Sequence, residues 1–353
     1  MKVIRSILVH LFTGANIATI FLLWACCGST YLHPADFPRL GLLGLAFPFL
    51  LIPNILFIFF WLIFKIKRIW LPILGLLACF PFLRAYYPVN WHSEAPDTTA
   101  LSILSYNTCY YGRGPTAPEN SKQDCINYIA ESGADIICLQ ESSREADLEK
   151  EMKAQGYELY NSHELTIYSR LPILSVDTIS IAPYLRFALK AFLLDGQDTI
   201  MLINQHLQSN KLSKQMKTAY RKALEQHESD SVRKELRPII QLLSEALPRR
   251  AAQADTLASI IEQWQPRPVI LCGDFNDTPV SYPHRVLTRH LTSAYCQSGH
   301  GVGFTFQEKG FPVRIDHILF SDDRWTSHET YVDKSILCSD HYPILTKLVK
   351  KAP

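Results

Sequence analysis

Residues 269–279 read VILCGDFNDTP, and this stretch decides how the rest of the sequence is interpreted. The apolar run VILC has the length and composition of a buried strand. Asp274, Asn276 and Asp277 follow at the point where the run stops. Since Asp, Asn and Gly are also common turn residues, this stretch alone fits a turn about as well as a reaction site. Other stretches of the same kind are needed to decide.

Five further apolar runs end in, or begin with, polar side chains. They are SYN ending at Asn107, LQE ending at Glu141, INQHL at 203–207 with His206, IDHI at 315–318 with Asp316, and SDHYP at 339–343 with Asp340 and His341. If the strands bring these ends to one rim, carboxylates, amides and imidazoles gather there. Any one stretch is weak evidence, but six in one domain make coincidence a poor explanation. We therefore expect a reaction site assembled from strand ends.

The pattern between residues 100 and 353 is typical of an α/β fold. Strands are expected at 101–106, 135–139, 165–168, 187–194, 199–204, 268–272 and 315–320, and helices at 121–132, 145–155 and 251–264. Pro238 and Pro248 are expected to interrupt any helix that precedes the last of these. Many short strands with few crossover helices predict a mixed or antiparallel sheet core flanked by helices.

The first 87 residues have the composition of a membrane domain. Residues 6–27 and 40–64 form apolar stretches of 22 and 25 residues, each long enough to cross a bilayer as a helix. A third stretch, 69–83, has only 15 residues. A cleaved signal peptide is the alternative for the first stretch, but a second long span follows it. We expect a membrane domain at 1–87 with two or three helices, a polar linker at 88–99 and a catalytic domain at 100–353.

Charge predicts the orientation of these helices. Lys2 and Arg5 flank the first span, and Lys65, Lys67 and Arg68 follow the second. By the positive-inside rule both groups are cytoplasmic, so three spans would place the catalytic domain outside the cytoplasm. If the third stretch is re-entrant, that domain is cytoplasmic instead. Residues 97–353 carry 28 Lys/Arg and 31 Asp/Glu, which argues against a strongly basic surface that coats nucleic acid.

The motifs together resemble the endonuclease/exonuclease/phosphatase superfamily, which includes deoxyribonucleases, apurinic endonucleases and sphingomyelinases. The resemblance runs from about Leu101 to Leu348, keeps the order of the motifs, and is most specific in GDFND and SDHYP. With its apolar N-terminal region, the chain resembles a membrane-anchored, bacterial-type member. The resemblance implies a four-layer α/β sandwich with two packed central mixed sheets. It also implies hydrolysis of phosphate esters that depends on a divalent metal.

The metal site that the resemblance implies consists of Glu141 as the principal ligand, Asn107 nearby and Asp340 as a second carboxylate. Oxygen ligands of this kind suit Mg²⁺, with Mn²⁺ as the alternative ion. Asp274 is expected to orient or deprotonate the attacking water, and Asn276 to donate its amide to a phosphoryl oxygen. The remaining roles are a phosphate contact from His206, a cationic His341 held by Asp316, and candidate substrate contacts from Arg170 and Asn210.

These roles predict a membrane-anchored phosphoesterase that acts on phosphodiesters. The expected substrate is a nucleic acid or a phospholipid headgroup, and membrane lipids are expected partners of the N-terminal helices. The alternative is an inactive receptor or scaffold that retained the fold. The complete set of polar residues argues against this alternative, since a domain without activity would be expected to lose some of them.

Overall fold

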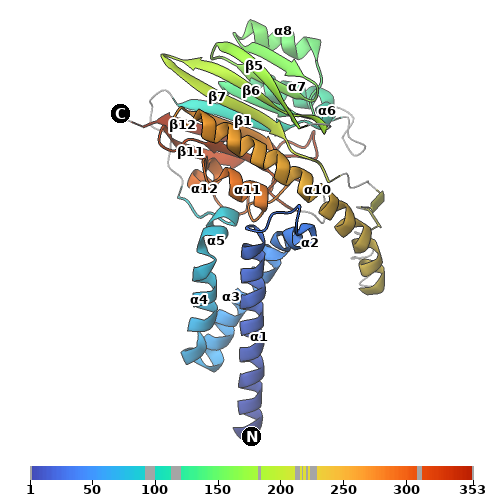
Figure 1. Cartoon of the computed structure of the whole chain (residues 1–353), viewed down its shortest axis with the longest axis vertical. Coiled ribbons are helices and arrows are strands. Elements are labelled where there is room, and N and C mark those ends of the chain that lie inside the picture. Colours follow the sequence, from blue (N-terminus) through green and yellow to red (C-terminus); the bar gives the residue numbers. More distant parts are fainter. Residues whose placement is uncertain are drawn as a thin grey trace.

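A computed structural model of the chain describes most of its length. The described residues are 2–91, 100–112, 121–181, 184–210, 215–216, 218–219, 222, 229–307 and 312–351. Most of the linker expected at 88–99 lies outside them. Two six-stranded sheets, preceded by apolar helices, make up the architecture (Figure 1).

Each sheet combines parallel and antiparallel neighbours. The first has the order β11-β12-β1-β2-β4-β3, with β1 (Leu101–Asn107), β2 (Ile136–Gln140), β3 (Glu158–Ser162), β4 (Leu165–Ser169), β11 (Trp325–Val332) and β12 (Ile344–Lys350). The second has the order β5-β6-β7-β8-β10-β9, with β5 (Ile173–Ile181), β6 (Tyr184–Asp195), β7 (Asp198–His206), β8 (Val269–Asp274), β9 (Thr292–Ser293) and β10 (Asp316–Phe320). Only β1–β2 and β7–β8 pair in parallel among these strands. The mixed sheets expected from the sequence are therefore confirmed.

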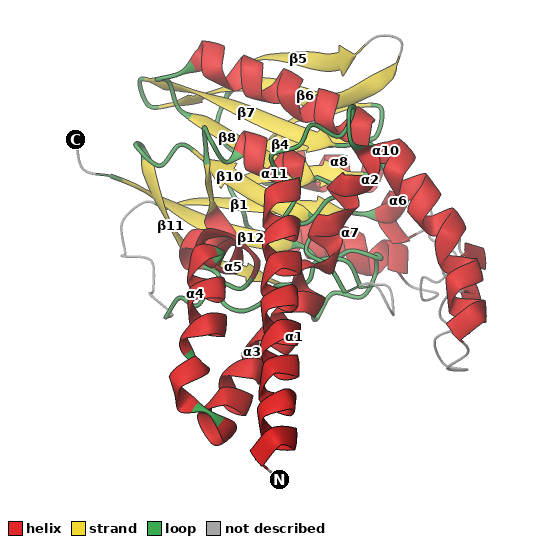
Figure 2. Cartoon of the chain, turned by 60° about the horizontal axis from the view of Figure 1, so that its bottom comes forward, coloured by secondary structure: helices red, strands yellow, loops and turns green. Residues whose placement is uncertain are grey.

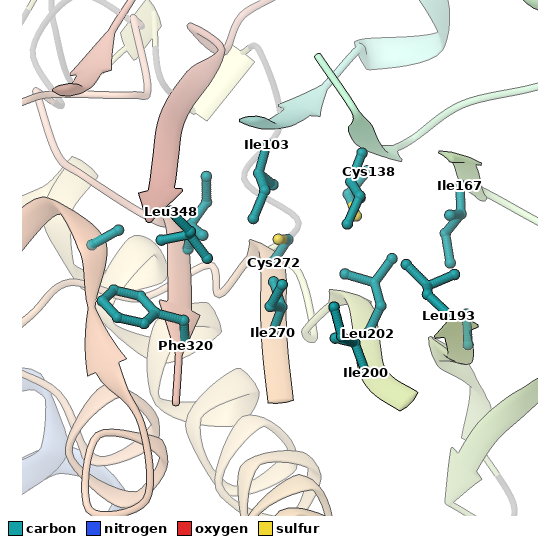
Figure 3. Close-up of a cluster of buried hydrophobic side chains, with 14 of the residues drawn as sticks. Ile103, Cys138, Ile167, Leu193, Ile200, Leu202, Ile270, Cys272, Phe320 and Leu348 are labelled. Atoms are coloured by element: carbon teal, nitrogen blue, oxygen red, sulfur yellow. The ribbon is translucent and has the colours of Figure 1, made fainter. Parts of the chain in front are cut away.

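The sheets pack face to face through an apolar core. Figure 3 shows Ile103, Cys138 and Ile167 of the first sheet pointing toward Leu202 and Ile270 of the second. Because side chains alternate along a strand, the neighbours of these residues point outward into a second apolar layer. On β2, for example, Ile137 and Leu139 pack on the outer side. Strands buried on both faces need helices outside them.

Helices cover the outer face of each sheet. On the first sheet, α7 (Ser121–Glu131) and α8 (Ala146–Ala154) pack through an apolar cluster that includes Ile129 and Leu148. On the second, α10 (Ser229–Trp264) and α11 (Tyr282–Leu287) pack through Leu257 and Val286. Figures 1 and 2 show α10 lying across the second sheet. The layers are helix, sheet, sheet and helix, which confirms the predicted α/β sandwich.

Helix α10 is longer than the sequence suggested. A helix was expected only from residue 251, after Pro238 and Pro248, but α10 begins at Ser229 and contains both prolines. A proline inside a helix removes a hydrogen bond and costs about 3 kcal/mol. Burial of Ile239 and Leu247 helps to offset this cost. The extension carries α10 past the sandwich and alongside α2, and its start lies away from α1, α3 and α4 (Figures 1 and 2).

The N-terminal helices form a bundle on one side of the sandwich (Figure 2). They are α1 (Lys2–Ser29), α2 (Pro38–Gly41), η1 (Leu42–Ala46), α3 (Phe47–Phe64), η2 (Ile66–Arg68), α4 (Trp70–Ala78) and α5 (Phe80–Tyr86). Two helices, Ser6–Ser29 and Pro38–Phe64, are long and apolar enough to span a membrane. The pair Ile66–Ala78 and Phe80–Tyr86, bent by 66°, could supply a third span.

The bundle and the sandwich are in direct contact. Val280, four residues after Asn276, packs into the apolar cluster of Leu23, Phe47 and Tyr86 at the sandwich end of the bundle. A Cβ on Gly44 would lie 1.9 Å from the carbonyl oxygen of Val280, so only glycine allows this approach. The segment that follows the GDFND motif is thus held against the N-terminal apolar helices.

Candidate active site

The strand ends singled out in the sequence meet at one edge of the sandwich. Within the second sheet, Asp274 pairs with both His206 of β7 and Asp316 of β10. Between the sheets, Nδ2 of Asn107 donates a hydrogen bond of 3.2 Å to Oδ2 of Asp274. Asp316 begins β10 and His341 precedes β12, and both of these strands run antiparallel to their neighbours. These residues therefore meet at the same edge, although some end a strand and others begin or precede one.

Asp274 lies at the centre of the cluster. Its Oδ2 accepts hydrogen bonds from Nδ2 of Asn107 and Nδ2 of Asn276, each 3.2 Å long. Nε2 of His206 and Nε2 of His341 lie 3.7 and 3.8 Å from the same oxygen. Burial, with repulsion from Asp316, raises the pKa of Asp274 to about 6. A carboxylate with this pKa is poised to accept a proton near neutral pH.

His341 and Asp316 form a buried pair. Nδ1 of His341 lies 2.8 Å from Oδ2 of Asp316. Burial alone would lower the pKa of His341, but the charges of Asp316 and Asp274 outweigh it and raise the pKa to about 10. The hydroxyl oxygen of Thr305 accepts hydrogen bonds from the backbone N–H groups of Ile315 and Asp316 and fixes the acid in place. His341 is therefore a cation at neutral pH.

Of the carboxylates of Glu141, Asp274 and Asp316, that of Glu141 is the most exposed to solvent. Its side chain is 26% exposed, whereas those of Asp274 and Asp316 are 1% exposed. Its Oε1 lies 3.3 Å from Nδ2 of Asn107 and 3.7 Å from Nε2 of His206. Its backbone has φ of +45°, a left-handed conformation that a non-glycine residue rarely adopts. The hydrogen bond of 2.6 Å from the N–H of Tyr110 to the Glu141 carbonyl stabilises this conformation.

Glu141 could hold a hard divalent cation. Asp274, Asp316 and His341 offer donor atoms within 4.8 Å of one another, but both acids are buried, and only Oδ1 of Asp316 lacks a hydrogen bond to a described residue. Mg²⁺ keeps several waters, so it requires a carboxylate open to solvent. Nε2 of His206, beside Glu141, is buried and makes no hydrogen bond to any described residue. This nitrogen lies 3.7 Å from both Oε1 of Glu141 and Oδ2 of Asp274.

Asn107 and Asp340 relate differently to the predicted metal site. The amide nitrogen of Asn107 faces Glu141 and Asp274, while its oxygen accepts the N–H of Cys109 at 3.1 Å. In this orientation Asn107 donates to the acids, and its role as a ligand stays a prediction. Asp340 is half-buried, and its charge contributes to the raised pKa of His341, which places its carboxylate near the cluster.

Arg170 is not part of the cluster. It follows β4, whose last residue, Ser169, pairs with Ile136 at the start of β2, whereas the site lies at the end of β2. Its N–H donates to the Asp135 carbonyl at 2.9 Å, and its guanidinium lies 4.8 Å from the Tyr157 ring centroid. Arg170 was expected to contact substrate, but the structure places it at the opposite end of β2 from the site. The residue braces the opposite edge of the first sheet.

Arg250 is a supporting residue that the sequence did not reveal. This buried side chain of α10 donates from Nη1 to the carbonyl oxygen of Asn276 and to Oδ1 of Asn210, both at 2.6 Å. Its Nε lies 3.4 Å from Oδ2 of Asp277. Asn276 has φ of +51°, and Arg250 holds this strained residue with its amide directed at Asp274. Asn210 was expected to contact substrate, but its side-chain oxygen accepts a hydrogen bond from Arg250.

The segment after β1, beside Glu141, also has a strained backbone. Cys109, Tyr110 and Tyr111 have φ of 45°, 54° and 60°, so three consecutive non-glycine residues are left-handed. Such residues cost on the order of 1–3 kcal/mol each and concentrate at functional sites. The hydroxyl of Tyr110 donates to the carboxylate of Glu164. Tyr110 thereby closes the side of the site next to Glu141.

His317 lies on the other face of β10 from Asp316. Its ring is fully buried, 4.7 Å from the Phe275 ring and 4.9 Å from the His284 ring. Burial lowers the pKa of His317 well below its usual value. A neutral imidazole packed between aromatic rings is structural, and His317 has no part in the cluster.

Solved structures share this fold at low sequence identity. An endonuclease/exonuclease/phosphatase from Bacteroides vulgatus is 16% identical, with a TM-score of 0.50 over 72% of this chain and 100% of that one. The human Nocturnin catalytic domain is 15% identical, with a TM-score of 0.49 over 71% and 95% of the two chains. Truncated Caenorhabditis elegans TDP2 is 19% identical, with a TM-score of 0.47 over 70% and 97%.

Two family models match separate parts of the sequence. The model of the Endonuclease/Exonuclease/phosphatase family matches residues 104–341, which include all the strand ends that form the cluster. A "Domain of unknown function (DUF8431)" matches residues 9–86, the apolar helices. No curated protein matches the chain. By the match to residues 104–341, the chain belongs to the Endonuclease/Exonuclease/phosphatase family.

Proposed function

We propose that the protein is a membrane-anchored phosphodiesterase that requires a divalent metal, Mg²⁺ or Mn²⁺. One observation carries this proposal: two amides and two imidazoles converge on the buried carboxylate of Asp274. A base surrounded by donors suits the attack of water on a phosphorus that carries negatively charged oxygens. Membership of the Endonuclease/Exonuclease/phosphatase family supports the same chemistry.

Each residue has a role in the proposed hydrolysis that follows from its charge. Asp274 takes a proton from the attacking water, whose oxygen forms a bond to phosphorus as one phosphoester bond breaks. The cationic His341, held by Asp316, stabilises the charge on the phosphoryl oxygens, and His206 and Asn276 donate to them. A divalent cation at Glu141 would neutralise further phosphoryl charge. The leaving oxygen takes up a proton.

We propose the boundaries 1–87, 88–99 and 100–353 for the membrane domain, the linker and the catalytic domain. The apolar helices α1, α3 and α4–α5 support the anchor. Figure 1 shows the N-terminus at the end of the bundle away from the sandwich, and Arg68 lies beside that half of α1, donating to the Val9 carbonyl at 3.0 Å. If Arg68 and its neighbours Lys65 and Lys67 lie in the cytoplasm, the sandwich would lie outside the cytoplasm.

The test uses full-length protein in detergent and bis-p-nitrophenyl phosphate as the substrate. Hydrolysis should require Mg²⁺ or Mn²⁺ and stop with EDTA. Asp274→Asn should lower kcat about 10²- to 10⁴-fold, because it removes the base. Asp323→Asn, an exposed position next to Arg324, is the matched control and should retain activity. If the wild type hydrolyses no ester with any divalent ion, the inactive receptor or scaffold becomes the better explanation.

A further inference from the structure

A cavity of about 660 Å³ lies beside the catalytic edge and has no part in the proposed hydrolysis. Three segments line it: residues 90–91, residues 295–304 and residues 329–334. Trp91, Tyr295, Phe304 and Tyr331 make much of the wall aromatic, and Lys334 adds a cation 5.8 Å from the Phe304 ring centroid. The volume is in the range of about 300–1,000 Å³ that small-molecule sites occupy.

One short segment connects this cavity to the catalytic residues. Phe304 lines the cavity, and two residues later the Phe306 ring lies 5.1 Å from the His341 ring. Between them, Thr305 accepts the N–H of Asp316 and donates its own N–H to the Val313 carbonyl. The cavity wall at Phe304 is therefore two residues from Phe306, whose ring lies beside His341.

The cavity also lies next to the end of the last membrane helix. α5 ends at Tyr86, and the chain then exposes Tyr87, Val89 and Trp91 by 47, 57 and 87%. Asn90 fixes this segment to the sandwich through hydrogen bonds to the carbonyls of Cys296 and Gly299, at 3.1 and 2.7 Å. Exposed tyrosine and tryptophan beside a membrane helix are typical of the membrane–water interface. The wall formed by Asn90 and Trp91 is thus at the level of lipid headgroups.

We infer that this cavity binds the apolar end of a membrane glycerophospholipid while its phosphodiester lies at Asp274 and His341. The inference rests on the proposed function and names the substrate of the same site. The aromatic wall suits the glycerol backbone and the first methylene groups, and Lys334 suits an anionic group at the rim. Water supplies the oxygen that binds phosphorus, and the leaving oxygen takes a proton. The product is diacylglycerol or phosphatidate, according to which ester bond breaks.

The experiment uses the full chain with three substrates: vesicles of equal parts phosphatidylethanolamine and phosphatidylglycerol, bis-p-nitrophenyl phosphate, and a single-stranded oligonucleotide. Trp91→Ser and Tyr331→Ser should each lower the ratio of lipid to small-ester kcat/KM about tenfold, the effect of one aromatic contact. Leu174→Ser is the matched control, since Leu174 is 54% exposed on β5 of the other sheet. Its ratio should equal that of the wild type.

A photoactivatable phosphatidylcholine provides a readout that does not depend on catalysis. In the wild type it should label peptides that contain Trp91, Phe304 or Tyr331, in addition to the membrane helices. Labelling confined to the helices, an unchanged ratio in both serine variants, or a preference for the oligonucleotide over lipid would overturn the inference while the proposed function stands. Failure of the wild type on all three substrates would instead refute the proposed function.

Discussion

Nδ1 of His341 lies 2.8 Å from Oδ2 of Asp316, and both side chains are buried. The other ring nitrogen of His341, Nε2, is 3.8 Å from Oδ2 of Asp274. One imidazole therefore bridges two buried acids, one on each of two paired strands. Both acids raise the pKa of the ring, so replacing either one by its amide should lower that pKa, and the two acids can be tested separately.

Asp316→Asn should lower the pKa of His341 below 10, because the charge of Asp316 is the largest contribution that raises it. The imidazolium would then lose its proton at a lower pH, and the alkaline fall in kcat/KM should move to lower pH. At a pH at which the imidazole of Asp316→Asn is neutral, His341→Ala should lose about as much activity as Asp316→Asn. The double variant should lose little more than either single variant, since the two residues act as a unit. Additive losses would show that the pair does not work together.

The wild-type pH profile should have two limbs. Asp274 must be deprotonated to act as a base, and its raised pKa of about 6 means that activity rises as the pH increases through that value. His341 must be protonated, and its pKa of about 10 means that activity falls as the pH increases through that value. Initial rates of bis-p-nitrophenyl phosphate hydrolysis at constant ionic strength measure both limbs. A flat profile between pH 5 and pH 7 (about one unit either side of the Asp274 pKa) would argue against Asp274 as the base.

Glu141→Gln should abolish metal-dependent activity with little effect on folding. The change keeps the shape of the side chain but removes the most solvent-exposed charge of the site. Binding of Mn²⁺, followed by electron paramagnetic resonance, should weaken together with the activity. Glu164→Gln, which changes the carboxylate that accepts from Tyr110, is a control for loss of a nearby charge. An active Glu141→Gln protein with the same metal dependence would contradict the metal assignment.

Arg250→Met should destabilise the sandwich by about 3–5 kcal/mol, because Asp277 would remain buried without its cation. Asp277→Asn in the same chain should recover part of that loss. Arg249→Met, at the adjacent exposed position, should change the free energy of unfolding by about 0.5 kcal/mol or less. Thermal denaturation followed by circular dichroism gives the comparison. Equal effects at 249 and 250 would mean that the buried ion pair contributes little.

Membrane orientation can be tested with alkaline phosphatase fusions, since this enzyme is active only outside the cytoplasm. A fusion after Pro88 should be active and a fusion at Lys67 inactive, because the bent pair α4–α5 would cross the bilayer between them. Inactive fusions at Pro88 together with active ones at Lys67 would mean the opposite orientation. Two inactive fusions would mean that the third segment does not cross.

Part of the candidate site could be predicted from short motifs, because each of them places a polar residue at the carboxyl end of a strand. Asn107 and Asp274 end β1 and β8, and Glu141 follows β2. The carboxyl ends of these strands meet at one edge, so short motifs were enough to predict that the three residues lie together. Arg170 also follows a strand, but β4 runs antiparallel to β2 and carries it to the opposite edge. The direction of β4 depends on its pairing within the sheet, which no motif in the sequence specifies.

Arg250 could not be predicted for a different reason. It lies 26 residues before Asn276 on a helix, and its burial depends on how α10 packs over the second sheet. The prolines in α10 also misled the sequence interpretation, because their local cost is outweighed by tertiary contacts such as that of Leu247 with Gly41. Long-range packing therefore decided both features.

The contact between Gly44 and Val280 has a practical consequence for studies of this protein. A fragment that begins after the linker would expose Val280, and the guanidinium of Arg314, which donates to the Ala85 carbonyl, would lose that acceptor. Both positions are close in sequence to residues of the candidate site, Val280 to Asn276 and Arg314 to Asp316. Deleting the N-terminal helices would therefore disturb the segments that carry Asn276 and Asp316, and detergent or nanodiscs, which keep the whole chain, are the better route to an intact preparation.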